Sequence, residues 1–305
     1  MQEASSRPNP LPSAWPYRML VMLVVGAALL IVGFLGSSAW GSVVALGLVE
    51  GLTEFLPISS TAHLLISAKL LGFQENIGGT FEVFIQLGAI LAVVGYYARD
   101  LTTQARALPT SAAARRFWMT IMVAFLPAAL VGLALHTWIK QVLFESPSVI
   151  AWALIAGGVV FIVIERWRLP PARPQNAEPI SLRQALSVGI AQIFALIPGV
   201  SRSGASIVGG MLSGLDRSTA TTFSFYLAIP TLGAATVVDL FGSLDRLTTG
   251  DIGRLTVGTL VSMVIAWLTI GWLLRYVTTH SFAVFGIYRI IAGFAILALI
   301  AVGVL

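Results

Sequence analysis

The chain has 305 residues, of which 57% are hydrophobic and only 10% are charged, with a net charge of +5. A soluble protein carries about 25% charged residues, so this composition indicates that lipid solvates much of the surface. The lack of cysteine excludes disulfides and thiolate metal sites. Arginines fall in short loops between apolar runs, which argues against a nucleic-acid partner. Membrane lipids are the expected surroundings.

The N-terminal region divides into a polar arm and a first apolar run. Residues 1–17 contain four prolines together with serine and asparagine, which predicts a disordered arm. Residues 18–39 are apolar for long enough to span about 30 Å of hydrocarbon. The competing interpretation is a cleaved signal peptide that ends in small residues near position 39. The length of the apolar run favours an uncleaved, additional transmembrane helix.

Two shorter apolar segments differ from the full-length spans. Residues 41–56 and 184–197 are each followed by proline, small hydroxyl residues and a second short apolar stretch, at 64–72 and 205–215. Broken backbone at membrane depth is tolerated where protein buries it or where it lines a wet cavity. Both segments are therefore predicted to form re-entrant helical hairpins within an all-α polytopic fold. The full-length spans are expected at 81–98, 117–136, 147–164, 221–241, 254–275 and 282–304.

Loop charges and an internal repeat define the expected topology. The loops at 99–116 and 165–183 carry four arginines each, which by the positive-inside rule places both in the cytoplasm. A shift of 142 positions brings the two broken segments into register. Three spans separate equivalent positions, so the two halves, residues 40–164 and 184–305, are predicted to be inverted. Such repeats place a site near the membrane midplane, where the hairpin tips meet.

The first hairpin concentrates polar residues in a segment expected at membrane depth. Glu50 and Glu54 share a helix face, and a carboxylate there costs about 2.5–3.5 kcal/mol on insertion scales. The two must be paired, metal-bound or partly protonated; the structural alternative is a pair that only binds a buried arginine. Packing does not explain the hydroxyls and the imidazole that follow within the same fourteen residues, namely Ser59, Ser60, Thr61 and His63.

The second hairpin, at residues 198–206, has the composition of a phosphate site. Its two glycines are expected to let backbone N–H groups approach a ligand, and the helix that follows would point its N-terminus at the tip. Arg202 adds a planar guanidinium that suits phosphate oxygens. The alternative is that Arg202 only neutralises one of the two glutamates, and the two roles can alternate.

Residues 50–63 and 198–206 resemble the two signature segments of the undecaprenyl-diphosphate phosphatase family, also called the bacitracin-resistance family. The stretches 80–88, 223–230 and 287–289 are similar to it as well. The resemblance implies an inverted repeat with re-entrant hairpins in the bacterial cytoplasmic membrane, with the site open to the outer face. It also implies divalent-cation-dependent hydrolysis of undecaprenyl diphosphate to the monophosphate, which recycles the carrier lipid for cell-wall synthesis.

Two features depart from the family pattern. Ala62 stands where the family usually has glycine, which is expected to stiffen or slightly narrow the hairpin tip. The polar arm and the span at 18–39 are additional, and they are not expected to change the chemistry.

The resemblance and the residue chemistry together suggest roles at the two tips. Ser60 is the candidate nucleophile, with His63 as its general base or as the acid for the leaving group; direct attack by water and a phospho-histidine stay open. Glu50 and Glu54 are expected to hold Mg²⁺ or Ca²⁺, or to position water and the imidazole. The expected phosphate ligands are Ser59, Thr61, Ser201, Arg202, Ser203 and Gly204.

Other interpretations stay open from the sequence. A lipid transporter or flippase is the main alternative, because inverted repeats with broken helices are a transporter architecture; an assembly protein without turnover is the third. The glycine-rich run at 156–158 suggests close helix packing or a homodimer. Phe81, Phe84 and Phe225 are candidates for an apolar groove that holds a prenyl tail. Gln192, the repeat counterpart of the first glutamate, is expected to make either a polar contact or an ordinary packing contact.

Overall fold

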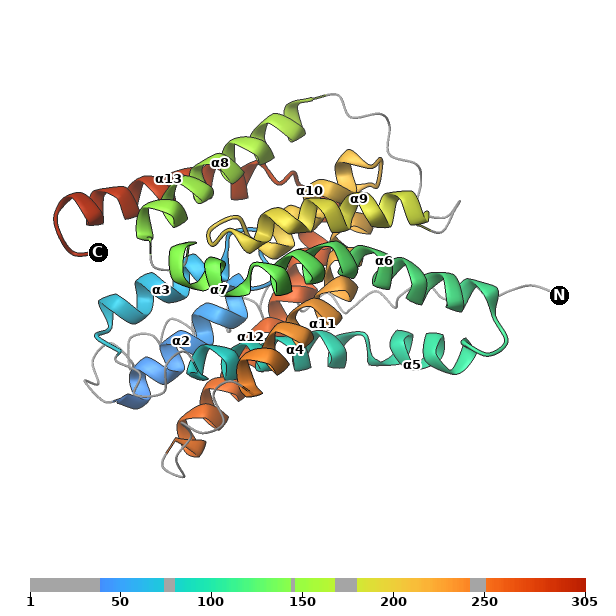
Figure 1. Cartoon of the computed structure of the whole chain (residues 1–305), viewed down its shortest axis with the longest axis horizontal. Helices are drawn as coiled ribbons and strands as arrows, with labels where there is room; N and C mark the ends of the chain where they lie inside the picture. The colour runs from blue at the N-terminus through green and yellow to red at the C-terminus, as the bar shows by residue number, and fades with distance from the viewer. Residues whose placement is uncertain (1–38, 74–79, 144–145, 168–179, 242–250) are drawn as a thin grey trace.

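The computed structural model describes residues 39–73, 80–143, 146–167, 180–241 and 251–305. Every regular element within these ranges is helical (Figure 1). In chain order the elements are α2 (Ala39–Thr53), α3 (Ser60–Leu70), α4 (Thr80–Tyr96), α5 (Ala98–Ala107), α6 (Ala112–Ala134), α7 (His136–Trp138), the π-helical η1 (Ile139–Leu143), α8 (Pro147–Arg166), α9 (Leu182–Ile193), the 3₁₀ turn η2 (Phe194–Leu196), α10 (Arg202–Leu212), α11 (Arg217–Phe241), α12 (Ile252–Thr279) and α13 (Ala283–Ala301).

Five described helices are long and apolar enough to cross a membrane, and a bent pair would make a sixth. The five are α6, α8, α11, α12 and α13, and the bent pair is α4 with α5. The expectation of an all-helical, multi-pass membrane protein is therefore confirmed. The predicted disordered arm at 1–17 and nearly all of the predicted extra span at 18–39 lie outside the described residues; only Ala39 is described, and it begins α2.

The predicted loop at 99–116 is partly helical. After Tyr96 the chain turns by 67° and continues as α5. At the bend, the ring centroid of Tyr97 lies 4.4 Å from that of Tyr226 on α11. None of the residues of α5 is buried, and an acidic first turn and a basic last turn suit its helix dipole. The sequence expectation missed α5 because its residues are too polar for a span.

The ends of the other expected loops are also helical. Residues 165 and 166 complete α8, and 182 and 183 begin α9, so the predicted loop at 165–183 is shorter than expected. Within 137–146, the structure describes the end of α7 and the π-helical turn η1. Most of the expected loop at 242–253 lies outside the described residues.

Glycines allow close packing between α8 and α13, which lie side by side in Figure 1. A Cβ atom on Gly158 would lie 2.5 Å from the carbonyl oxygen of Gly286, and a Cβ on Gly286 would lie 2.8 Å from that of Gly158. The small residues at 156–158 therefore serve contacts within the chain. The homodimer stays a prediction without support from this feature.

The two broken segments have matching backbones. Ser59, before α3, and Ser201, before α10, have φ angles of 72° and 78°, and they are the described non-glycine residues with positive φ. Gly72 and Gly214, which follow the same two helices, have positive φ as well. Each pair is 142 positions apart, so the backbone repeats at the spacing found in the sequence. The inversion of the halves and the re-entrant course of the hairpins stay predictions.

Candidate active site at the two helix breaks

Both helix breaks contain a proline. The helix α2 ends at Thr53 and η2 ends at Leu196, and Pro57 and Pro198 follow within the two breaks. Proline lacks an N–H group and restricts the preceding residue, so the helices do not resume there. At each break a serine in the left-handed region precedes the next helix. Such a conformation is uncommon for a residue with a Cβ atom and concentrates at functional sites, so the two tips are candidates for a functional site.

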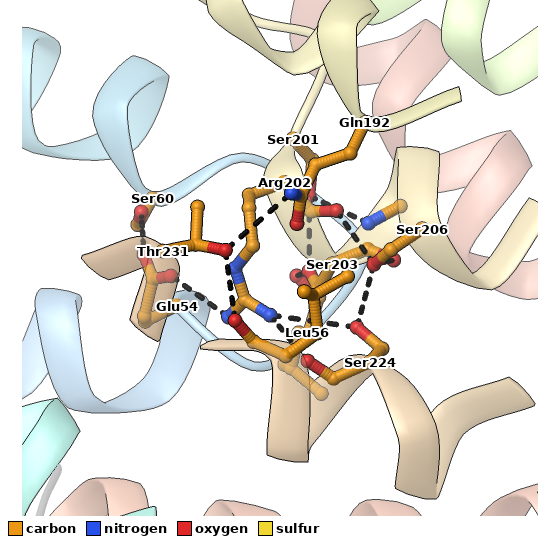
Figure 2. A network of polar contacts seen from close by, with 12 residues as sticks. Glu54, Leu56, Ser60, Gln192, Ser201, Arg202, Ser203, Ser206, Ser224 and Thr231 are labelled. Atoms are coloured by element: carbon orange, nitrogen blue, oxygen red, sulfur yellow. Dashed lines mark hydrogen bonds and ion pairs between the residues drawn. The ribbon is translucent and has the colours of Figure 1, made fainter. Parts of the chain in front are cut away.

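A chain of polar contacts joins the two tips (Figure 2). The Ser60 hydroxyl donates a hydrogen bond of 2.5 Å to Oε2 of Glu54. The other oxygen of Glu54 accepts from Nη2 of Arg202 at 3.1 Å, and Nη1 of Arg202 donates to the carbonyl of Ser224 at 2.9 Å. The Glu54 and Arg202 side chains are only 5% and 10% exposed. A pair this buried depends on each partner for compensation of its charge.

The second tip uses its hydroxyls largely to fix its own backbone. Ser201 Oγ accepts from the N–H of Gly204 at 3.1 Å and lies 3.0 Å from Ser203 Oγ. Ser203 Oγ donates to the carbonyl of Leu56 in the first tip, at 3.0 Å. Ser201 Oγ thus caps α10, and the N–H of Gly204 already has an acceptor in this structure; its role as a phosphate ligand stays a prediction. Ser201 and Ser203 still retain lone pairs for a further contact.

The glycines of the second tip make room for neighbouring protein. A Cβ atom on Gly199 would lie 2.5 Å from the carbonyl oxygen of Ile150 on α8. One on Gly204 would lie 3.1 Å from Nη1 of Arg289. These small residues therefore bring the tip close to α8 and α13; that they also bring backbone N–H groups close to a ligand stays a prediction.

Arg289 of α13 lies beneath both tips and is fully buried. Nη1 donates to the carbonyls of Pro57 and Val200, at 3.1 and 2.8 Å. Its other hydrogen bonds to described residues end on backbone carbonyls too, those of Ala153, Leu154 and Gly199. These five bonds do not neutralise the guanidinium. The positive charge left beneath the tips favours an anionic ligand.

His63 is not paired with Ser60 in this structure. Its Nδ1 lies 2.7 Å from the carbonyl oxygen of Ser59, and its Nε2 lies 2.6 Å from the hydroxyl of Tyr288 on α13. Both ring nitrogens thus have partners, while the Ser60 hydroxyl is held by Glu54. The sequence expectation of His63 as the base for Ser60 does not match this geometry, because the turn at Ser59 directs the imidazole towards α13.

Glu50 and Gln192 occupy equivalent positions in the two halves, and both are buried. Neither carboxylate oxygen of Glu50 has a hydrogen-bond partner among the described residues. Gln192 donates to Thr231 Oγ1 at 3.4 Å, and its own Oε1 is also without a described partner. Thr61 lies on the first turn of α3 and is half-buried. Glu50 is the carboxylate still available to a cation.

An apolar cavity of about 150 Å³ opens between α2, α3 and α4. Phe81, one of the phenylalanines expected to contact a lipid tail, lines it together with Leu46 and Leu64. Phe84 packs against the group of buried side chains to which Leu46, Leu64 and Phe81 belong. Phe225 does not: it is fully buried and meets Phe55 edge to face at 5.1 Å, so it belongs to the core. Glu82 is the charged residue of the cavity lining.

The structure thus brings Glu54, Ser60, Arg202 and the second-tip hydroxyls together, and it adds residues that the sequence did not single out. Tyr288 and Arg289 lie in a stretch noted only for its family resemblance, although an arginine in an apolar span is itself a signal of function. Ser224 also lies in a stretch noted only for its family resemblance, 223–230, and its contact with Arg202 is partly through a backbone carbonyl, which no sequence pattern marks. The additional residues are Leu56, Ser206, Ser224, Tyr288 and Arg289.

Comparison with known proteins gives one consistent family. The family model described as "Bacitracin resistance protein BacA" matches residues 43–295. A protein from Albidiferax ferrireducens named undecaprenyl-diphosphatase is 48% identical over 256 residues, which cover 83% of this chain and 92% of that protein. Proteins of the same name from Deinococcus deserti and Cereibacter sphaeroides are 47% and 46% identical, over 87% and 85% of this chain and 97% and 96% of theirs.

Proposed function

Because this chain belongs to the bacitracin resistance protein family, we propose that it is an integral membrane phosphatase that hydrolyses undecaprenyl diphosphate to the monophosphate and inorganic phosphate. The observation that carries the proposal is the continuous contact from Ser60 through Glu54 to Arg202, which places a hydroxyl, a carboxylate and a guanidinium at the junction of the tips. A polyprenyl diphosphate is the lipid substrate, and its hydrolysis returns the carrier to cell-wall synthesis. The transporter alternative draws no support from the names of the relatives.

The first step is attack by Ser60 on the terminal phosphorus. Glu54 Oε2 already accepts the hydroxyl hydrogen and takes the proton as the Oγ–P bond forms. The bridging P–O bond breaks, and the lipid monophosphate leaves with the bonding electrons. Arg202 stabilises the charge on the transferred group, since phosphoryl transfer depends mainly on positioning and electrostatics. For this, its guanidinium exchanges part of its contact with Glu54 for phosphate oxygens.

The second step is hydrolysis of the phosphoserine by water. A water oxygen bonds to phosphorus, the P–Oγ bond breaks, and Oγ recovers its proton from Glu54. The proton of the water goes to Nε2 of His63, because Glu54 is protonated when this step begins and cannot serve as its base; His63 then gives this proton to the departing phosphate or to water, which restores the neutral imidazole. This division of roles follows from the pairing of Ser60 with Glu54 rather than with His63. Ser59, whose hydroxyl does not cap α3, and Thr61 are left to contact phosphate oxygens.

A divalent cation fits the first tip. Both oxygens of buried Glu50 are without a described partner, and hard oxygen donors of this kind suit Mg²⁺ or Ca²⁺. Mg²⁺ is commonly held by one or two carboxylates together with substrate phosphates, so Glu50 would suffice as the main ligand, even though no cluster of three acidic or imidazole side chains occurs in the described part of the chain. Glu54 would add a second carboxylate through a lone pair that its bonds to Ser60 and Arg202 leave over. When bound, the cation would neutralise diphosphate charge.

The apolar cavity beside the first tip suits the start of the prenyl tail. It is lined by side chains of α2, α3 and α4, which also bear or adjoin the candidate catalytic residues. We assign the protein to the bacterial cytoplasmic membrane, with the site open to the outer face; the positive loops at 99–116 and 165–183 support this orientation.

The test is release of inorganic phosphate from undecaprenyl diphosphate by the purified full chain in detergent. Wild type should release phosphate, His63→Gln should slow release strongly, and a chelator should stop it until Mg²⁺ or Ca²⁺ is restored. No release by folded wild type, with metal present and over several prenyl lengths, would contradict the proposal. Movement of labelled lipid phosphate in proteoliposomes without hydrolysis would then identify a transporter.

A further inference from the structure

Tyr288 is the one hydrogen-bond partner of the His63 imidazole from another helix among the contacts described. Its hydroxyl lies 2.6 Å from Nε2, and the two rings are stacked, 10° from parallel with centroids 5.6 Å apart. The next residue, Arg289, holds the backbones of both tips. Two successive residues of α13 therefore contact the site: Tyr288 contacts the His63 imidazole, and Arg289 contacts the backbone of both tips.

The partners of His63 determine where its protons lie. A carbonyl oxygen can only accept, so Nδ1 carries the hydrogen that is donated to Ser59. In the neutral ring, Nε2 then has a lone pair and accepts from the phenol of Tyr288. The basic nitrogen of His63 is thus directed at α13 and away from the hydroxyl of Ser60, which already has Glu54 as its acceptor.

Burial distinguishes the two polar pairs at the first tip. Ser60 and Glu54 are 7% and 5% exposed, whereas Tyr288 is 43% exposed on the surface of α13. The Nε2 atom of His63 faces this second, less buried pair. We propose that Tyr288 is a positioning residue for His63: its phenol holds the neutral imidazole with Nε2 facing α13 until the water molecule of the second half-reaction takes its place. This proposal rests on the proposed phosphatase function.

The kinetic test compares two single-atom changes on similar tyrosine–histidine stacks. Tyr288→Phe keeps the ring and removes the hydroxyl. Tyr276→Phe is the matched control, because Tyr276 also stacks on a histidine, His280, with centroids 4.5 Å apart. Misplacing a reacting group costs roughly 10- to 100-fold in rate, so kcat of Tyr288→Phe should fall by about that factor with KM nearly unchanged. Tyr276→Phe should keep both constants.

A double variant tests whether Tyr288 acts through His63. In a His63→Gln background, Tyr288→Phe should cause little further loss, since the group that it positions is gone. Equal fractional losses in both backgrounds would mean that the phenol acts elsewhere, and that result would overturn the proposal.

A spectroscopic measurement tests the contact without turnover. In protein labelled with ¹⁵N-histidine, the His63 signals are assigned by their loss in His63→Gln. The Nε2 signal should shift in Tyr288→Phe and stay in place in Tyr276→Phe. An unchanged signal, or a wild-type kcat in Tyr288→Phe, would overturn this proposal alone. Failure of wild type to release phosphate would instead overturn the proposed function, and with it this role of Tyr288.

Discussion

The two tips share a backbone but carry different chemistry. In each, a proline lies in the break after one helix, a serine with positive φ turns the chain, and the next residue starts a new helix. That next residue is Ser60 in the first tip and Arg202 in the second, 142 positions apart. The repeated backbone thus presents the proposed nucleophile from one half and the proposed phosphate-binding cation from the other.

The two serines with positive φ, Ser59 and Ser201, also differ in what their side chains contact. Ser201 Oγ caps its helix by accepting from the N–H of Gly204, whereas the Ser59 side chain makes no cap and its carbonyl holds the imidazole of His63. The second tip is therefore tied to itself, while the first leaves polar groups available for a ligand. This comparison suggests that substitutions in the first tip should affect mainly the chemistry, and that some in the second should affect mainly stability.

The largest expected effect is at Ser60. Ser60→Ala removes the proposed nucleophile, and loss of a nucleophile in such a unit can cost about 10⁴-fold or more in kcat. Ser59→Ala should cost about 10-fold or less, because Ser59 offers one hydroxyl contact to phosphate. Phosphate release under single-turnover conditions measures both. Equal losses in the two variants would argue against Ser60 as the nucleophile and favour direct attack by water.

The next effect is at Arg202. Arg202→Ala should lower kcat/KM by about 10²- to 10³-fold, the usual loss when a donor that stabilises transition-state charge is removed. Arg217→Ala is the control: Arg217 pairs with Glu165 through two hydrogen bonds, and it lies at the start of α11. Near-normal turnover of Arg202→Ala in folded protein would place the phosphate site elsewhere. Loss of turnover in Arg217→Ala would show that the assay reports general damage to the fold.

The sequence was sufficient to predict the two breaks, because proline and small hydroxyl residues interrupt otherwise apolar helices. It also placed Glu54, Ser60 and Arg202 at one site, since charges at membrane depth need partners. The partner of His63 was not predictable in the same way. Tyr288 lies 225 positions away, and only the packing of α3 against α13 brings them together.

Arg289 shows a second limit of the sequence. Its acceptors are backbone carbonyls on α8 and on both tips, and a carbonyl has no sequence signature. The packing contacts of the glycines were not predictable for a related reason. The sequence marks where a Cβ is missing, but it does not say whether a ligand or another helix fills the space.

A smaller effect is expected at the equivalent positions Glu50 and Gln192. Glu50→Gln makes the first tip resemble the second, and it should raise the Mg²⁺ concentration for half-maximal turnover by about 10-fold or more, since an uncharged amide is a poorer ligand for a hard cation. Glu50→Asp should recover part of the affinity. Gln192→Asn, the matched change in the other half, should leave the metal dependence unchanged. An unaltered metal requirement in Glu50→Gln would move the cation site away from this carboxylate.

The smallest effect on turnover is expected at Ser203, which ties the tips together through the carbonyl of Leu56. Ser203→Ala should lower the free energy of unfolding by about 0.5–1.5 kcal/mol, because a buried hydrogen bond between the tips is lost while the Leu56 carbonyl keeps the N–H of Ile58 as a donor, at 2.8 Å. Tryptophan fluorescence during titration with a denaturing detergent measures this loss. Ser213→Ala is the control, since its hydroxyl donates to Gly210 within the same helix end, where α10 can adjust.

Comparison of Ser203→Ala with Arg202→Ala separates the stabilising role of the second tip from its role in binding phosphate. A loss of stability in Ser203→Ala, with kcat reduced less than in Arg202→Ala, would mean that this hydroxyl joins the hairpins and that Arg202 binds the phosphate. A loss of kcat as large as that of Arg202→Ala, at unchanged stability, would mean that Ser203 leaves Leu56 to contact the substrate. The two tips would then both supply ligand contacts, and the division between a chemical tip and a supporting tip would be wrong.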